Sequence, residues 1–270
     1  MPDSNSATKK TEISSADAFF DKSAFIFKEF VNDKGMVNYK TLKRKKLELS
    51  KLLDEFSALD PNEYNSWSQE DKIAFWLNAY NLEMLKIIIS NYPIESTRIL
   101  RIIWHPDSIR HIQGIWDQYK FIVLDEQFTL QELDKRFFRE KFNEPKVFFA
   151  MTYASLSSPP LRNEPYYGPR LNEQLDDQVK KFLANRLAFK IDMEKQKVSL
   201  SAIFEPLWYG QYFIGRYGTD KKFKDQPPAT RAVLNFITNY ISEADVRYLE
   251  TANYTVEYIN YKWRLNDTIF

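Results

Sequence analysis

The most apolar stretch of the chain covers residues 73–89 and is hydrophobic on nearly every side. A helix that is apolar all round is typical of a protein core, so we predict a central buried helix here. Ser68 and Asp71 form an N-cap pair ahead of it. Tyr92-Pro93 marks its end, because the residue before a proline avoids the helical region.

Apolar residues spaced three and four apart predict further amphipathic helices around this central one. The first follows the Ser14-Ser15 pair and is expected to end at Gly35. A capping box, Thr129–Glu132, precedes another helix, and Pro227-Pro228 starts the last one. The inward-facing positions are Phe20, Phe27, Phe30 and Val31; Leu49, Leu52, Leu53 and Phe56; Leu130, Leu133, Phe137 and Phe138; Leu171, Leu175, Val179 and Phe182; and Ala232, Val233, Phe236, Ile237 and Tyr240.

Short extended segments between these helices predict a few strands, at residues 36–39, 119–124, 147–151, 189–191, 198–200 and 256–265. A hairpin is expected around Glu194-Lys195, and residues 147–151 are interpreted as a buried strand that leads into a polar loop. Helices around a few strands indicate the α+β class, with one central buried helix and a small, mostly antiparallel sheet. We expect a disordered lead over residues 1–13 and a single domain over residues 14–270.

Composition and charge restrict the kinds of molecule that the protein is expected to bind. The chain has 270 residues, a net charge of +1 and 16% aromatic residues, which is enough ring area for a substantial core. A nearly balanced charge argues against nucleic acid as a partner, and the basic run at residues 43–46 is interpreted as a solvated helix face. No apolar stretch reaches the length of a bilayer span, so no transmembrane segment is expected, and residues 1–13 show no export signal.

The absence of cysteine excludes disulfides, thiol catalysis and cysteine-ligated metals. The two histidines, His105 and His111, lie six residues apart with no acidic partner at helical spacing, which is poor geometry for a metal pair. The chain also has neither an H-E-x-x-H motif nor a calcium loop. We therefore expect no metal and no cofactor.

Polar residues on the apolar central helix, and in the loop that follows the apolar run 147–151, are candidates for functional residues. Asn78 and Asn81 lie one turn apart on the predicted central helix. A buried amide must be hydrogen-bonded, because an unpaired one costs roughly 1–3 kcal/mol. The pair therefore either ties a loop to the helix or lines a site. The second group is the loop with Ser155 and Ser158, which Pro159-Pro160 stiffens; such loops often carry sites.

Five ordered segments carry a family resemblance. They read A-F-W-L-N-A-Y-N at 74–81, F-A-M-T-Y-A-S-L-S-S-P-P-L-R at 149–162, L-N-E-Q-L-D-D at 171–177, L-S-A-I-F at 200–204 and Y-K-W-R-L-N at 261–266. Together they resemble the motifs of the domain of unknown function 547 family. Each motif alone is weak, but the ordered set is specific.

The chain departs from the family pattern at the reactive positions. Phe148 stands where the family usually has histidine, Tyr153 and Ser158 stand where it has two cysteines, and Lys262 replaces an aspartate. Histidine and cysteine can supply a base and a nucleophile, or a thiol pair. The resemblance thus implies a degenerate member without thiol or Cys-His chemistry. The resemblance also suggests the cell envelope as the location, but the sequence itself does not indicate the compartment.

Two functions follow from these observations. The first is a non-catalytic protein that binds an unidentified small molecule or protein, or has a structural role, with a pocket of rings and amides. The residues expected to line this pocket are Asn78, Tyr80, Asn81, Tyr153, Ser155, Arg162 and Asn163. Arg162 would either hold a carboxylate or phosphate or form a structural salt bridge with Glu164 or Asp176.

The alternative is a hydrolase in which Ser155 or Ser158 attacks the substrate. A serine needs an adjacent base, and only His105 or His111 could act as a histidine base, with His111 as the candidate. Neither histidine lies in the serine loop, and the chain has no G-x-S-x-G elbow.

Overall fold

The predicted central helix is present as α5 (Gln69–Ser90) in the computed structural model, which describes residues 14–96 and 100–269. Its side chains between Ile73 and Ile89 are almost all buried, so the prediction of a buried helix is confirmed. The Ser68 hydroxyl accepts a hydrogen bond from the backbone N–H of Asp71 at 3.0 Å and caps the first turn. The lead predicted at residues 1–13 lies outside the described residues.

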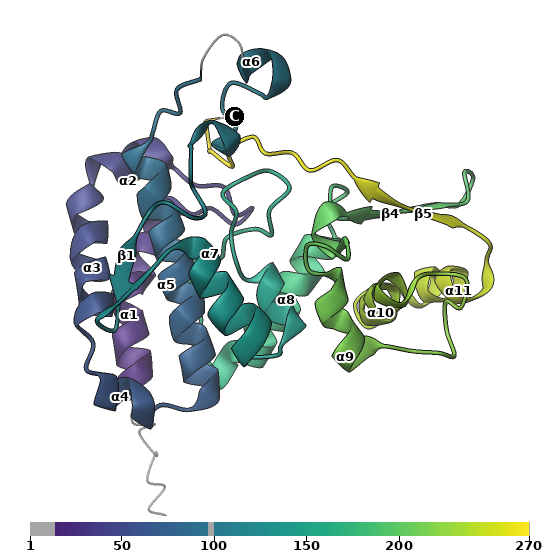
Figure 1. Cartoon of the computed structure of the whole chain (residues 1–270), viewed down its shortest axis with the longest axis horizontal. Helices are drawn as coiled ribbons and strands as arrows, with labels where there is room; N and C mark the ends of the chain where they lie inside the picture. The colour runs from purple at the N-terminus through teal and green to yellow at the C-terminus, as the bar shows by residue number, and fades with distance from the viewer. Residues whose placement is uncertain (1–13, 97–99, 270) are drawn as a thin grey trace, which may run out of the picture.

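Helices α1, α2 and α3 pack on α5, and α7 and the short helix η4 also contact it (Figure 1). The helices are α1 (Ser15–Phe30), α2 (Tyr39–Arg44), α3 (Lys46–Ala58), α4 (Pro61–Ser66), α6 (Leu100–Ile103), α7 (Leu130–Leu133), α8 (Leu171–Leu183), α9 (Ile214–Tyr217), α10 (Pro228–Ile237) and α11 (Glu243–Thr251). The 3-10 helices are η1 (Ile109–His111), η3 (Pro145–Phe149), η4 (Gly168–Arg170), η5 (Ala202–Phe204) and η6 (Gly210–Phe213), and η2 (Asp134–Lys141) is a π-helix.

Helix α1 ends at Phe30 and not at Gly35, where we predicted its end. The chain turns over the next residues, and Gly35 has a φ of +73°, in the left-handed region that favours glycine. A Cβ atom at Gly35 would lie 2.6 Å from the Cβ atom of Pro160. Glycine therefore allows this turn to pack directly on the proline pair of the serine loop.

The prediction of a strand at residues 147–151 is wrong. Residues 147–149 belong to the 3-10 helix η3, and residues 150–151 form the turn and bend after it. The Glu144 carboxylate caps η3 and accepts a hydrogen bond from the backbone N–H of Lys146 at 3.2 Å. The side chains of Val147, Phe148 and Phe149 are all buried. A short apolar run that is buried on every side does not distinguish a strand from a helical turn, and here the turn forms.

Two small sheets complete the α+β fold. The hairpin β1 (Phe121–Val123) and β2 (Glu126–Phe128) forms one sheet, and β3 (Phe189–Asp192), β4 (Lys197–Ser201) and β5 (Thr255–Ile259) form the other. Strand β4 pairs with β3 in antiparallel and with β5 in parallel orientation. The predicted hairpin around residues 194–195 and the α+β class are therefore confirmed. The expected small sheet is present as two sheets, in which β1–β2 and β3–β4 pair in antiparallel and β4–β5 in parallel orientation.

The chain after β5 is extended but forms no continuous strand, so the strand predicted at residues 256–265 is shorter than expected. It instead makes isolated bridges with three separate segments, which pair Arg264 with Ser108, Leu265 with Ser155 and Asp267 with Val37. Because each bridge uses a different partner, no ladder develops. This C-terminal tail ties the serine loop to the N-terminal half of the molecule.

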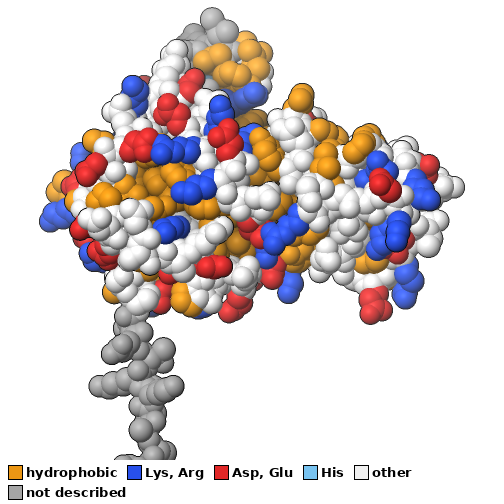
Figure 2. Space-filling view, turned by 60° about the horizontal axis from the view of Figure 1, so that its bottom comes forward, with side chains coloured by type: hydrophobic (Ala, Val, Ile, Leu, Met, Phe, Trp, Pro, Cys, Tyr) orange, Lys and Arg blue, Asp and Glu red, His pale blue; other side chains and the backbone are white. Residues whose placement is uncertain are grey.

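The surface mixes charges of both signs. In the view of Figure 2, Lys and Arg side chains are interspersed with Asp and Glu, and no extended area of one sign appears on this face. Among the described helices, none has both the length and the apolar character that a bilayer crossing requires.

One carboxyl group is buried on α5. The Glu83 side chain is 3% exposed, and its nearest cation is Lys86, whose Nζ lies 3.8 Å from Oε2. Burial raises the pKa of Glu83 to about 7, although Lys86 acts in the opposite direction. The folded-state pKa thus exceeds the ordinary value of 4.5, so the neutral form favours folding. This contribution is complete below the lower pKa and is lost as the pH rises through the higher one.

We predict that Glu83→Gln, which stays neutral, removes this loss. Relative to the parent chain, the free energy of unfolding of the variant should rise by about 3 kcal/mol between ~pH 4.5 and ~pH 8. Urea unfolding across this range measures the difference. Glu70→Gln, at an exposed position of the same helix, is the control and should show a nearly constant difference. A constant difference for Glu83→Gln as well would contradict the prediction.

Candidate functional site

The two asparagines of α5 hold two loops. The Asn78 amide donates to the backbone carbonyl of Tyr166 and accepts from its N–H, both at 2.9 Å. Asn81 donates to the carbonyl of Ala150 and accepts from the N–H of Thr152, also at 2.9 Å. Both side chains are completely buried. The structure thus places these amides in loop-tying bonds, one of the two roles that the sequence left open.

The predicted serines take part in the bonding of their own loop. The Ser158 hydroxyl accepts from the N–H of Tyr153 at 2.8 Å and donates to the carbonyl of Pro159 at 2.9 Å. The Ser155 hydroxyl donates to the hydroxyl of Tyr261 at 3.3 Å, across to the C-terminal tail. Both serines are buried. These contacts hold the loop in shape.

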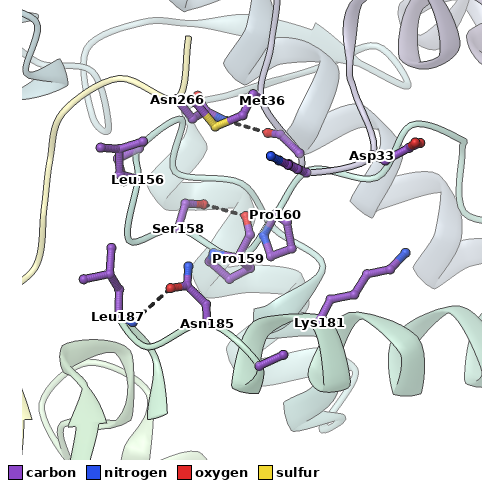
Figure 3. A pocket seen from close by; sticks show the side chains of 14 residues that line it. Asp33, Met36, Leu156, Ser158, Pro159, Pro160, Lys181, Asn185, Leu187 and Asn266 are labelled. Atoms are coloured by element: carbon purple, nitrogen blue, oxygen red, sulfur yellow. Dashed lines mark hydrogen bonds between the residues drawn. The ribbon is translucent and has the colours of Figure 1, made fainter. Parts of the chain in front are cut away.

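A hollow of about 510 Å³, the serine-loop hollow, lies beside these serines. Figure 3 shows the Ser158 hydroxyl turned toward the Pro159 carbonyl, with Lys181 and Asn185 on α8 and the segment after it. Asp33 and Met36, from the turn after α1, line another part of the hollow. Its ionisable lining groups are one carboxylate and two lysines, with no histidine among them.

The histidines lie in a different segment. The His111 Nε2 atom is 2.9 Å from the carbonyl oxygen of His105, and the His105 Nδ1 atom is 3.4 Å from the carboxylate of Asp107. Within residues 14–96 and 100–269, no hydrogen bond joins Ser155 or Ser158 to a histidine. The structure therefore does not bring together the nucleophile and the base that the hydrolase alternative requires.

Arg162 is engaged in a salt-bridge network. Its Nη2 atom lies 2.6 Å from Glu164 Oε1, and its Nη1 atom pairs with Asp177. The expected partner Glu164 is thus present, but Asp176 is not the other one, because its carboxylate pairs with Lys146 at 3.2 Å. Neighbouring residues of a helix point about 100° apart, so a shift of one position selects a different partner.

Asn163, the remaining predicted pocket residue, lies on the surface. Its side-chain amide donates to Asp33 Oδ1 at 2.9 Å and connects the loop to the turn after α1.

A second hollow, which we call the aromatic pocket, contains two of the predicted residues. Its volume is about 260 Å³. Three buried tyrosines, Tyr80, Tyr153 and Tyr209, and three half-buried tryptophans line it, together with Leu130, Gln131, Asp134 and Arg139. The tryptophans are Trp116, Trp208 and Trp263.

A polar network crosses this pocket. The Asp134 Oδ2 atom accepts from Arg139 Nε at 2.8 Å and from the Tyr209 hydroxyl at 3.0 Å. The Tyr153 hydroxyl donates to the Tyr209 hydroxyl at 2.6 Å. Burial raises the pKa of Asp134, against the effect of Arg139, and holds the pKa of Tyr209 well above its ordinary value. The tyrosines are therefore neutral and serve as hydrogen-bond donors.

The second oxygen of Asp134 has no partner among the described residues. Asp134 is 8% exposed, and its Oδ1 atom is buried without a hydrogen bond from the described residues. A buried acceptor without a donor is costly, so a hydrogen bond from a water molecule or a ligand hydroxyl would stabilise this oxygen.

The family's histidine and first cysteine positions both meet Tyr209. Phe148 stacks on the Tyr209 ring with 3.9 Å between centroids and 15° between planes, and Tyr153 bonds its hydroxyl. The third substituted position, Ser158, bonds instead within the serine loop. Of these positions, Tyr153 lines the aromatic pocket, and Phe148 packs on the ring of the lining residue Tyr209.

Sequence analysis missed most of the pocket lining, namely Trp116, Leu130, Gln131, Asp134, Arg139, Trp208, Tyr209 and Trp263. The aromatic content of residues 204–213 and of the tail was the available signal. These segments are far apart along the chain, and only the fold brings them to α5.

We predict that Asn81→Ala lowers the free energy of unfolding by about 2–5 kcal/mol, since it leaves the buried carbonyl of Ala150 and the N–H of Thr152 unpaired. Chemical unfolding measures the loss. Asn62→Ala, at an exposed position of α4, is the matched control and should change stability by less than about 0.5 kcal/mol. Equal effects of the two substitutions would contradict the role of Asn81.

In a comparison with known protein families, residues 64–183 match the family model described as "Protein of unknown function, DUF547". The matched range contains α5, the serine loop and α8, and it includes Tyr80 and Tyr153 of the aromatic pocket. The search of curated proteins and the search of solved structures gave no match. The resemblance seen in the sequence motifs is thus confirmed by the match of residues 64–183 to the DUF547 family model.

Proposed function

We propose that this chain is a non-catalytic binding protein and that a small molecule occupies its aromatic pocket. The observation that carries the proposal is a hollow lined by three half-buried tryptophans and three buried tyrosines, together with one buried carboxylate oxygen that has no donor among the described residues. Sites for small molecules commonly combine mainly apolar walls with a few placed polar groups.

The side chains of Phe148 and Tyr153 favour binding over catalysis. Phe148 and Tyr153 occupy the positions where the family resemblance expects a histidine and a cysteine. Phenylalanine cannot transfer a proton, and burial holds the pKa of Tyr153 well above its ordinary value. Neither side chain can act as a base or a nucleophile near neutral pH.

The serine loop gives no support to the hydrolase alternative. A serine nucleophile needs a base within hydrogen-bond reach, whereas the Ser158 hydroxyl bonds two backbone groups of its own loop. The serine-loop hollow is therefore a weaker candidate for the functional site than the aromatic pocket.

Contacts within the protein also hold two of the tryptophan rings of the pocket. Arg139 donates to the carbonyl of Trp208 at 3.2 Å, and the Trp208 and Trp263 rings stack with 5.7 Å between centroids. A site whose rings are fixed before binding loses less conformational entropy when a ligand enters.

We predict that a screen of small fragments by ligand-detected NMR finds molecules that bind this pocket and that Trp208→Ala weakens them at least about tenfold, since the ligand loses a ring contact. Trp104→Ala is the matched control, because Trp104 is also half-buried but does not line the pocket. Circular dichroism checks that both variants fold. The absence of any bound fragment, or equal losses in both variants, would contradict the proposed function.

A further inference from the structure

We propose that the ligand of the aromatic pocket is a neutral, puckered ring with hydroxyl groups, that is, one monosaccharide unit. This inference rests on the proposed function and specifies the class of its ligand. Four properties of the pocket support it: its charge, its open acceptor, the orientation of its rings and its size.

The charges within the pocket compensate each other. Among the residues that line it, Asp134 and Arg139 are the ionisable pair that carries opposite charges, and they bind each other at 2.8 Å. The guanidinium carbon of Arg139 also lies 4.5 Å from the centroid of the Tyr209 ring. A charged ligand would compete with one member of this ion pair for the other, whereas a neutral ligand leaves the pair intact.

The buried carboxylate favours a ligand with a hydrogen-bond donor. The Oδ2 atom of Asp134 already has two donors, while Oδ1 has none among the described residues. Gln131, on the exposed side of the pocket, adds an amide that can both donate and accept. A sugar hydroxyl can donate to the carboxylate, and a second hydroxyl can bond the amide.

The orientation of the rings favours a puckered ligand over a flat one. The nearly parallel pair Trp208 and Trp263 stack on each other, with 5.7 Å between centroids and 12° between planes, so these two rings do not sandwich a flat ligand between them. Trp116 meets Trp263 and Tyr153 with 65° between planes in both cases. Ring faces in several orientations suit the C–H groups that a pyranose presents on both of its sides.

The size of the pocket limits the ligand to one ring. Pockets for drug-sized ligands enclose roughly 300–1,000 Å³. The aromatic pocket, at about 260 Å³, lies just below this range and therefore suits a single sugar unit, free or at the end of a longer chain.

The experiment is a titration of the full chain, followed by calorimetry and saturation-transfer NMR. The neutral probes are glucose, galactose, mannose and N-acetylglucosamine, and the contrasting probes are glucosamine (cationic), glucuronate (anionic) and adenosine (flat). We expect at least one neutral sugar to bind with a Kd on the order of 1–10 mM. We expect the contrasting probes to bind at least about tenfold more weakly.

Two variants locate the binding. Gln131→Leu should weaken the neutral sugar at least about fivefold, whereas Gln127→Leu, at an exposed position of β2 outside the pocket, is the matched control and should leave binding unchanged. Asp134→Asn leaves Arg139 without its counter-charge, so binding of glucuronate relative to glucose should increase in this variant.

The outcomes separate the two proposals. If fragments bind the pocket but glucosamine, glucuronate or adenosine binds more tightly than every neutral sugar, or no sugar binds, the ligand class is wrong while the binding site stands. If neither fragments nor sugars bind, both proposals fail. Equal losses in Gln131→Leu and Gln127→Leu would overturn the placement of the sugar in this pocket.

Discussion

The structure depends on the hydrogen bonds with which one helix satisfies the backbone of two buried loops. Segments such as residues 150–152 and 166 have no strand partner, yet their backbone groups are buried and must be paired. Asn78 and Asn81 each offer an amide that both donates and accepts, as a neighbouring strand would. Tyr80 lies between them in sequence, so the helix that positions the loops also supplies one wall of the aromatic pocket.

The same loops and the C-terminal tail bring distant aromatic residues together. The bridge between Ser155 and Leu265 fixes the tail beside the loop that carries Tyr153. This placement brings Trp263, two residues before Leu265, to the same pocket as Tyr153. The DUF547 match supplies α5 and the loop, whereas Trp208, Tyr209 and Trp263 come from beyond its end at residue 183. The pocket is therefore assembled from the family segment and from the rest of the chain.

Local sequence patterns predicted the helices and strands that neighbouring residues along the chain determine. The apolar spacing and the Ser68 cap were sufficient for α5, and the turn at residues 194–195 was sufficient for its hairpin. The run at residues 147–151 failed because a single buried turn of 3-10 helix has no period that separates it from a strand. Helix α11 was missed because only Leu249 on it is buried, so its apolar spacing is weak.

The candidate site was predicted only in part, because local sequence patterns do not show which distant residues meet. Motif comparison identified Tyr80 and Tyr153, both of which line the aromatic pocket. It also identified Asn78, Ser158 and Arg162, whose side chains bond within the protein. A sequence shows that a polar residue is buried, but it does not show which backbone group lies opposite. The partner decides whether such a residue supports a loop or faces a ligand, and that depends on contacts across long sequence separations.

The central claim, that the aromatic pocket is the binding site, is tested most directly by NMR of the tryptophan indole N–H groups in a chain labelled with ¹⁵N-tryptophan. The chain has six tryptophans, three of which line the pocket. On addition of the tightest-binding neutral probe, the account predicts saturable shifts for Trp116, Trp208 and Trp263, with little change for Trp67, Trp76 and Trp104. Shifts confined to the second group, or no saturable shift in the first, would contradict it.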